Sequence, residues 1–80
     1  MVGYSTNVAL ADGGTFTAPV NGIAEISATS GTVTLQMYIK DAYSNCPTTI
    51  ANGNFLALGA IQQGTTIKIT GGTANLHFWK

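Results

Sequence analysis

The side chains that could carry acid–base or nucleophilic chemistry are few in this chain. The carboxylates, the single histidine and the single cysteine are Asp12, Glu25, Asp41, His77 and Cys46. General acid–base catalysis needs two titratable groups brought together, and a triad of Ser27, His77 and Glu25 can be assembled on paper. The Gly-x-Ser-x-Gly sequence that presents a nucleophilic serine on a sharp turn is absent. The sequence therefore predicts no catalytic residue and a protein that is not an enzyme.

The sequence also has few residues that could bind a metal or a cofactor. A structural zinc site takes about four Cys or His ligands, and the chain has one of each. Asp41 and Asn45 could contact a calcium ion, but a single carboxylate gives weak affinity. No segment matches the Gly-x-x-x-x-Gly-Lys-Ser/Thr pattern that cradles phosphates. We expect no metal and no cofactor, and Cys46 is expected to be a free thiol because an internal disulfide needs a second cysteine.

One group of residues has the composition of a binding surface. Aromatic rings with nearby amides recognise sugars, which offer C–H faces and hydroxyl groups, but protein interfaces also enrich tyrosine and tryptophan. The residues that could form such a patch are Tyr38, Tyr43, Asn45, Asn54, His77 and Trp79. The sequence leaves both a glycan contact and a protein contact open, and favours the protein contact.

The charge of the chain excludes several classes of partner. Three lysines, no arginine and three acidic residues give zero formal net charge, and charged residues are 8% of the chain, against about 25% in typical soluble domains. Three lysines cannot build the basic stripe that displaces counterions from nucleic-acid phosphates, nor a polybasic membrane contact. Neither an 18-residue apolar run nor a signal-peptide pattern is present. We expect no nucleic-acid partner, no membrane contact and synthesis in a cytoplasm.

The length predicts a single domain over residues 1–80. A chain this short buries only about 60–65% of its unfolded surface, so it is marginally stable without further help. A disulfide and a structural metal are excluded above, which leaves oligomerisation. Hydrophobic residues make up 45% of the chain, which argues against disorder, and a neutral surface with few charges favours association.

The elements that must position these residues are strands. Threonine, isoleucine and valine, which suit a pleated surface, make up 23 of the 80 residues. Turn signals such as Asn21-Gly22 and Asn52-Gly53 recur between short β-rich runs, a pattern typical of an all-β sandwich or barrel. The expected strands are Asn7–Leu10, Thr15–Ala18, Ile23–Thr29, Thr32–Lys40, Phe55–Ile61, Thr65–Thr70 and Thr73–Trp79.

The connections between these strands are also predicted. Ser30-Gly31 and Gly71-Gly72 are compact enough to be hairpin turns, and Asp41–Asn52 is expected to be one long loop. The clearest strand is Thr32–Lys40, in which Val33, Leu35, Met37 and Ile39 share one face. Together these features predict a small antiparallel β-sandwich or jelly-roll-like barrel.

Two strands carry apolar residues on both faces. In Phe55–Ile61 one face carries Phe55, Ala57 and Ile61, and the other carries Leu56, Leu58 and Ala60. A strand of a thin sandwich normally keeps one face polar, so the second face is expected to pack on another subunit. In the last strand, alternation places Trp79 outside, which is costly in water. The sequence therefore predicts an oligomer interface formed by Leu56, Leu58, Ala60 and Trp79.

Longer stretches of the sequence resemble a known group of proteins. Gly14-Thr-Phe-Thr-Ala-Pro19, followed by Asn21-Gly22 and the strand Ile23–Ala28, resembles the start of small trimeric β-sandwich modules in bacteriophage virions. A Val-x-Leu-x-Met-x-Ile strand, an Asn-Gly connection, a Gln-x-Gly-x-x-Ile-x-Ile segment and a closing aromatic strand follow in a similar order. This rhythm is also similar to the jelly-roll heads of the tumour-necrosis-factor and complement-head superfamily, where three subunits meet at a threefold axis. The resemblance covers Thr15–Trp79, and no functional residue carries over, because these families share a scaffold and not a site.

The resemblance implies a structural role. The sequence has no coiled-coil or collagen-like stretch that could form a fibre shaft. We therefore expect a homotrimeric capsid decoration (cement) protein, made in the host cytoplasm and carried on the bacteriophage virion, that binds the major capsid protein or other virion proteins and stabilises the shell. The alternative is a carbohydrate- or receptor-binding head, lectin-like or from a tail fibre or spike, with Tyr38, Tyr43, Asn45 and His77 as contacts. A third hypothesis is a small accessory subunit of a cellular enzyme or secretion assembly.

Overall fold

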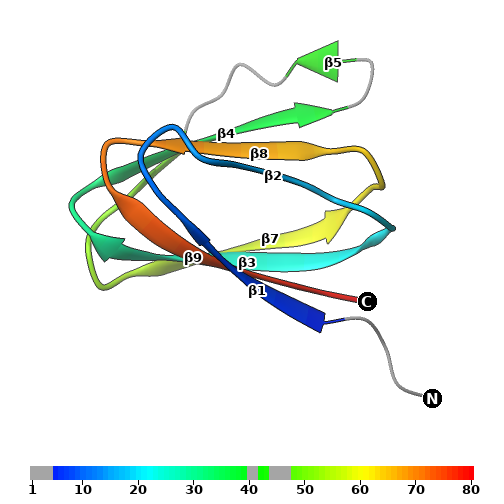
Figure 1. Ribbon diagram of the computed structural model, residues 1–80, viewed down its shortest axis with the longest axis horizontal. Coiled ribbons are helices and arrows are strands. Elements are labelled where there is room, and N and C mark those ends of the chain that lie inside the picture. The colour runs from blue at the N-terminus through cyan, green and yellow to red at the C-terminus, as the bar shows by residue number, and fades with distance from the viewer. Residues whose placement is uncertain (1–4, 40–41, 44–47) are drawn as a thin grey trace.

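The computed structural model describes residues 5–39, 42–43 and 48–80, and this part of the chain is built from strands and turns (Figure 1). The prediction of an all-β domain is confirmed. The strands are β1 (Ser5–Leu10), β2 (Thr15–Thr17), β3 (Gly22–Ser30), β4 (Val33–Ile39), β5 (Ala42–Tyr43), β6 (Thr48–Ile50), β7 (Phe55–Ile61), β8 (Thr66–Thr70) and β9 (Thr73–Trp79).

The strands form two antiparallel sheets that pack face to face as two layers (Figure 1). The first sheet has the order β1-β9-β3-β7, and the second has the order β2-β8-β4-β5, with β6 also paired to β4. The chain passes from one sheet to the other at β1–β2, β2–β3, β3–β4, β6–β7, β7–β8 and β8–β9. This alternation between two antiparallel sheets is the jelly-roll arrangement.

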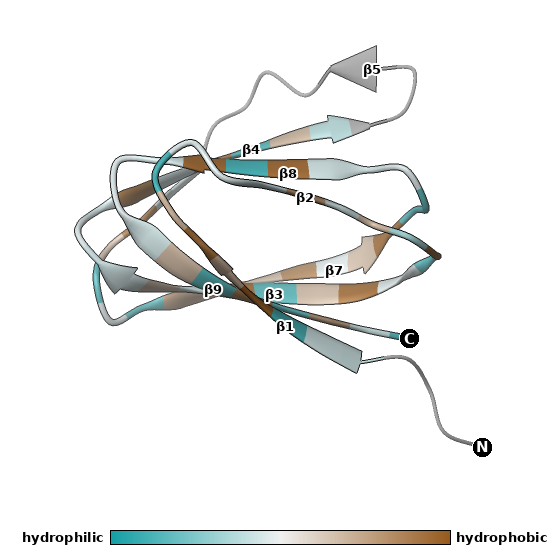
Figure 2. Cartoon of the chain, viewed as in Figure 1, coloured by the Kyte–Doolittle hydropathy of each residue, from teal (hydrophilic) through white to brown (hydrophobic). Residues whose placement is uncertain are grey.

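The core lies between the two sheets and is formed by alternate residues of each strand. Hydrophobic and hydrophilic residues alternate along β8, as Figure 2 shows, and Ile67 and Ile69 are fully buried. The rings of Phe16 and Phe78 lie 5.4 Å apart at 50°, a tilted pairing that adds about 0.5–1.5 kcal/mol beyond area burial. The largest buried side chains are Ile26, Val33, Ile67, Ile69, Leu76 and Phe78.

Within the first sheet, glycine is required at Gly22 and at Gly59. At Gly22, where β3 begins, a methyl group would lie 2.5 Å from the carbonyl oxygen of Trp79 and 2.6 Å from Cζ of Phe78. Gly59 adopts φ +75° within β7, where the pairing with β3 shifts between Ala24 and Glu25. A positive φ suits glycine and marks this shift as a β-bulge.

The structure corrects three predictions about connections. Ser30-Gly31 and Gly71-Gly72 are not hairpin turns, because each joins strands that belong to different sheets. Gly31 and Gly71 adopt φ +68° and +93°, which lets the chain turn sharply from one layer to the other. The segment expected to be one loop contains β5 and β6, because the β-branched run Thr48–Ile50 pairs with Val33–Leu35.

Candidate functional site

The polar side chains that could carry chemistry or bind a ligand lie on the outer face of the β1-β9-β3-β7 sheet. Strand pairing places Asn7 beside His77 and His77 beside Glu25, which gives one polar row across three strands. The adjacent row runs from Asn75 to Ser27 and on to Phe55. Both rows follow from the period-2 alternation of strands, which sends the intervening residues into the core.

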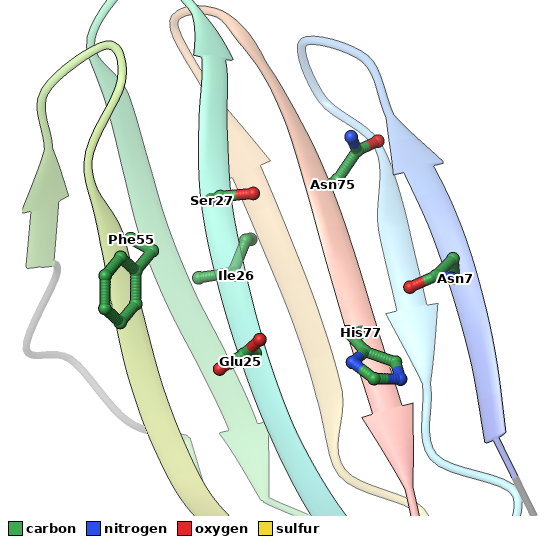
Figure 3. A pocket seen from close by; sticks show the side chains of 7 residues that line it. All are labelled: Asn7, Glu25, Ile26, Ser27, Phe55, Asn75 and His77. Carbon is green, nitrogen blue, oxygen red and sulfur yellow. The ribbon is translucent and has the colours of Figure 1, made fainter.

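These two rows line an open hollow of about 430 Å³. Figure 3 shows the side chains of its lining residues over four neighbouring strands, with Asn7 on β1, His77 on β9, Glu25 on β3 and Phe55 on β7. The full lining is Asn7, Glu25, Ile26, Ser27, Phe55, Asn75 and His77. Phe55 is 71% exposed, so its ring forms a hydrophobic side of the hollow. The polar side chains of the two rows form its floor.

His77 is held in place from two sides. The Ser5 hydroxyl and Nε2 of His77 share a hydrogen bond of 3.1 Å. The His77 and Trp79 rings lie 4.8 Å apart with an angle of 37° between their planes. The imidazole is therefore oriented before any ligand arrives.

The hollow gives no positive sign of catalysis. Ser27, His77 and Glu25 do line it together, but the hydrogen bond at Nε2 of His77 joins Ser5 and not Ser27. Ser27 lies in β3, which pairs with β7 on one side and β9 on the other, so the ladders on both sides use the backbone N–H groups that an oxyanion hole would need. Within the described residues no three His, Cys, Asp or Glu side chains come together to hold a metal ion.

The predicted interface residues divide between two environments. Leu56 and Leu58 are half-buried and pack against the core, so they do not share an outer face with Ala60, which is exposed. The bulge at Gly59 explains the difference, because one extra residue reverses the inside–outside alternation beyond it. The outer residues before the bulge are Phe55 and Ala57. Trp79 is half-buried beside His77, on the outer face as expected.

The aromatic patch suggested by the sequence is not assembled as one surface. Tyr38 belongs to β4 of the second sheet, whereas His77 belongs to β9 of the first. Asn45 and the side chain of Tyr43 lie outside the described residues. The residues that join His77 instead are Asn7, Asn75 and Phe55. The alternation within Thr73–Trp79 is enough to place Asn75 on the same face as His77. Asn7 and Phe55 belong to other strands, so their position beside His77 cannot be predicted without the strand order.

Comparisons with known proteins identify the fold and no family. No protein-family model and no curated protein matches the chain. A chain from Bacillus endospore appendages, described as a family of disulfide-linked pili, superposes with a TM-score of 0.63 at 12% identity, over 98% of this chain and 85% of that one.

Two enzymes share the fold over part of their length. Peruvianin-I, a cysteine peptidase from Thevetia peruviana latex, gives a TM-score of 0.57 at 14% identity, covering 94% of this chain and 47% of that one. The Fe(II) enzyme HppE gives 0.55 at 11% identity, covering 95% and 42%. This chain thus spans less than half of either enzyme. Such different proteins share only a scaffold with this one, a small antiparallel β-sandwich of the jelly-roll type.

The described residues include no helix long and apolar enough to cross a membrane.

Proposed function

We propose that the protein is a non-enzymatic structural subunit that works in many copies, and that the copies contact one another through an apolar row on the outer face of the β1-β9-β3-β7 sheet. The observation that carries this proposal is the contrast between the outer faces of the two sheets.

The outer face of the first sheet exposes hydrophobic side chains. Ile23 is 42% exposed, which is unusual for a large hydrophobic residue. Pairing places Ile23 between Ala60 and Trp79, so the apolar surface continues across three strands. Contiguous exposed apolar surface on a small protein marks an interaction site.

The outer face of the second sheet is polar. Its strands β2, β8 and β4 alternate inward hydrophobic residues with outward polar ones, and β6 adds Thr49 to the outward set. The outward residues are Thr15, Thr17, Thr34, Gln36, Tyr38, Thr49, Thr66, Lys68 and Thr70. This face suits water, whereas the apolar row on the outer face of the first sheet suits another protein surface.

The edge strand β7 supports the same interpretation. It lies at the end of the first sheet, and its sequence, Phe-Leu-Ala-Leu-Gly-Ala-Ile, contains no charged residue. Exposed edge strands are usually protected by charges or proline against pairing with other chains. An uncharged edge beside an apolar face is suited to contact with a second copy.

Within this class, we place the protein on a bacteriophage virion, as a homotrimeric decoration protein made in the host cytoplasm. The resemblance over Thr15–Trp79 and the jelly-roll fold support this setting. In that role each trimer binds the major capsid protein or other virion proteins and stabilises the assembled shell. The likeness to the Bacillus appendage chain supports a repeated surface filament as a second setting for the same kind of subunit.

The mass of the purified protein in solution tests the structural role. Light scattering behind a sizing column should give about three times the 8.2 kDa chain mass. Ile23→Lys should lower that mass, because a charge placed in a dry symmetric contact is repeated in every copy. Thr49→Lys is the matched control, since it adds the same charge at an exposed position on the outer face of the second sheet, opposite the uncharged Thr34, and should leave the mass unchanged. A wild-type monomer contradicts the proposal.

The virion setting has its own test. Assembled shells that lack the protein should release their contents at a lower temperature than decorated shells, and adding the protein back should restore resistance. Shells that survive heating unchanged without the protein contradict the decoration role. That result would not bear on self-assembly, which the mass in solution tests.

A further inference from the structure

We propose that the hollow on the outer face of the β1-β9-β3-β7 sheet binds a neutral saccharide. This binding function goes beyond self-assembly and uses a different part of the same face. The hollow consists of the two rows defined above, whereas the apolar row Trp79–Ile23–Ala60 lies beside them, toward the end of β9.

The chemistry of the lining selects the ligand class. The polar side chains that form the floor supply two amides, a hydroxyl, a carboxylate and an imidazole, from Asn7, Asn75, Ser27, Glu25 and His77. Amide and hydroxyl groups both donate and accept hydrogen bonds, and so do the hydroxyl groups of a sugar. Neither lysine nor arginine lines the hollow, so an anionic ligand would meet the Glu25 carboxylate without a fixed positive charge to offset it.

Other ligand classes fit less well. An apolar ligand would remove water from five polar side chains without replacing their hydrogen bonds, which is costly. A peptide could not add as a strand over this floor, because β9 and β3 are each paired on both sides. A zinc ion would find only Glu25 and His77 in the lining, fewer than the three protein ligands that even an open catalytic zinc site keeps. A calcium ion would find a single carboxylate, which gives weak affinity. A neutral polyhydroxylated molecule is the class that satisfies the floor.

Phe55 supplies the second element of a sugar site. Its exposed ring stands next to Ser27, its partner across β3 and β7, at the end of the row that begins with Asn75. The face of an aromatic ring carries a partial negative charge, and the C–H hydrogens on one face of a pyranose carry a weak partial positive charge. A sugar ring resting on Phe55 can therefore direct its hydroxyl groups to the polar floor.

The spacing of the polar side chains in the hollow matches the size of a hexose ring. Directly paired residues of neighbouring strands lie about 5 Å apart, and residues two apart on one strand lie about 7 Å apart. A single hexose ring can thus contact both polar rows at once. The volume of about 430 Å³ falls in the range of about 300–1,000 Å³ typical of small-molecule sites, and it has room for one or two sugar units.

Parts of the site are formed before binding. Ser5 and Trp79 orient His77, and Glu25 and Ser27 project from a central strand rather than from a loop. Trp79 is the only tryptophan of the chain and neighbours His77, so its fluorescence should report a ligand that enters the hollow.

The experiment titrates the full chain with neutral monosaccharides and short neutral oligosaccharides built from glucose, galactose, mannose and N-acetylglucosamine. Trp79 emission and amide chemical shifts are recorded up to tens of millimolar sugar. At least one neutral sugar should shift the signals of residues in both rows and saturate. Failure of every neutral sugar to do so, or saturable binding of sulfated or sialylated sugars alone, overturns the proposal.

Two variants and one control assign the site. Asn75→Ala and Phe55→Ala should each weaken binding by about 3- to 10-fold, as expected for one lost hydrogen bond or one lost ring contact. Gln62→Ala is the matched control, because it removes an exposed side-chain amide from outside the hollow and should leave affinity unchanged. Equal affinities for Asn75→Ala and Gln62→Ala overturn the assignment. Circular dichroism confirms that each variant is folded.

The result is separable from the test of self-assembly. Asn75→Ala should leave the mass in solution unchanged, and Ile23→Lys should leave saccharide binding within about twofold of wild type. A monomer that binds sugar contradicts the structural role alone, and an oligomer that binds no sugar contradicts the saccharide site alone.

Discussion

Replacing Gly22 by alanine tests the account of how the two middle strands of the first sheet meet. The added methyl group would lie 2.5 Å from the Trp79 carbonyl oxygen, and 2.6 and 3.0 Å from two carbons of the Phe78 ring. The ring belongs to a fully buried side chain that also packs on Phe16, so neither group can retreat without disturbing the core. Overpacking of this kind typically costs about 1–3 kcal/mol.

The cost of Gly22→Ala should be a large fraction of the free energy of unfolding. At roughly 0.05–0.15 kcal/mol per residue, a domain of this length has a free energy of unfolding of about 4–12 kcal/mol. Urea unfolding followed by Trp79 fluorescence, at one fixed protein concentration because assembly adds stability, should show the loss. With a urea m value of about 1 kcal/mol/M, the midpoint should fall by about 1–3 M.

A second substitution identifies the cause. Phe78→Leu removes the ring atoms that the new methyl group would meet, so Gly22→Ala should cost less in that background than in wild type, a coupling of about 0.5 kcal/mol or more. A cost below about 0.5 kcal/mol for Gly22→Ala alone, or strictly additive costs, would refute the reasoning.

Three further substitutions have defined outcomes. Leu35→Ala truncates a side chain that is 3% exposed, and it should lower the free energy of unfolding by about 2–5 kcal/mol in a denaturation curve; a smaller loss would mean that the site collapses. Leu58→Lys should lower the melting temperature measured by circular dichroism, because Leu58 packs against the core, whereas a change in mass with unchanged melting would place it in the interface. Asp12→Ala removes the carboxylate that accepts the Gly71 N–H at 2.9 Å, and urea denaturation should show a loss of about 0.5–1.5 kcal/mol; no loss would show that solvent replaces the bond.

Local pattern predicts most of the strands. Regular alternation in Thr32–Lys40 places Val33 and Leu35 inside, and both are buried as expected. The same alternation places Trp79 outside. These features are predictable because the inside–outside period of a strand depends only on its own backbone geometry.

The partner of each strand is not a local property. The turn chemistry of Ser30-Gly31 and Gly71-Gly72 fits a hairpin and a crossing between layers equally well, and the structure uses the crossing. Glycine within a strand is a known sign of a bulge, so Gly59 is the signal in the sequence that separates Leu58 from Ala60. The hollow depends on β1, β9, β3 and β7 lying side by side, and residues so distant in sequence give no signal of that order.

The crossings between sheets also have a consequence for biosynthesis. The position between β1 and β3 belongs to β9, which leaves the ribosome after β1 to β8. Until then β1 has no partner in the first sheet and β3 can pair only with β7, so the sheet cannot be completed. Pairing between such distant segments makes folding slow and leaves apolar strands exposed meanwhile. We therefore expect the nascent chain to fold only once β9 has left the ribosome, and chains shortened before β9 to be degraded or to aggregate.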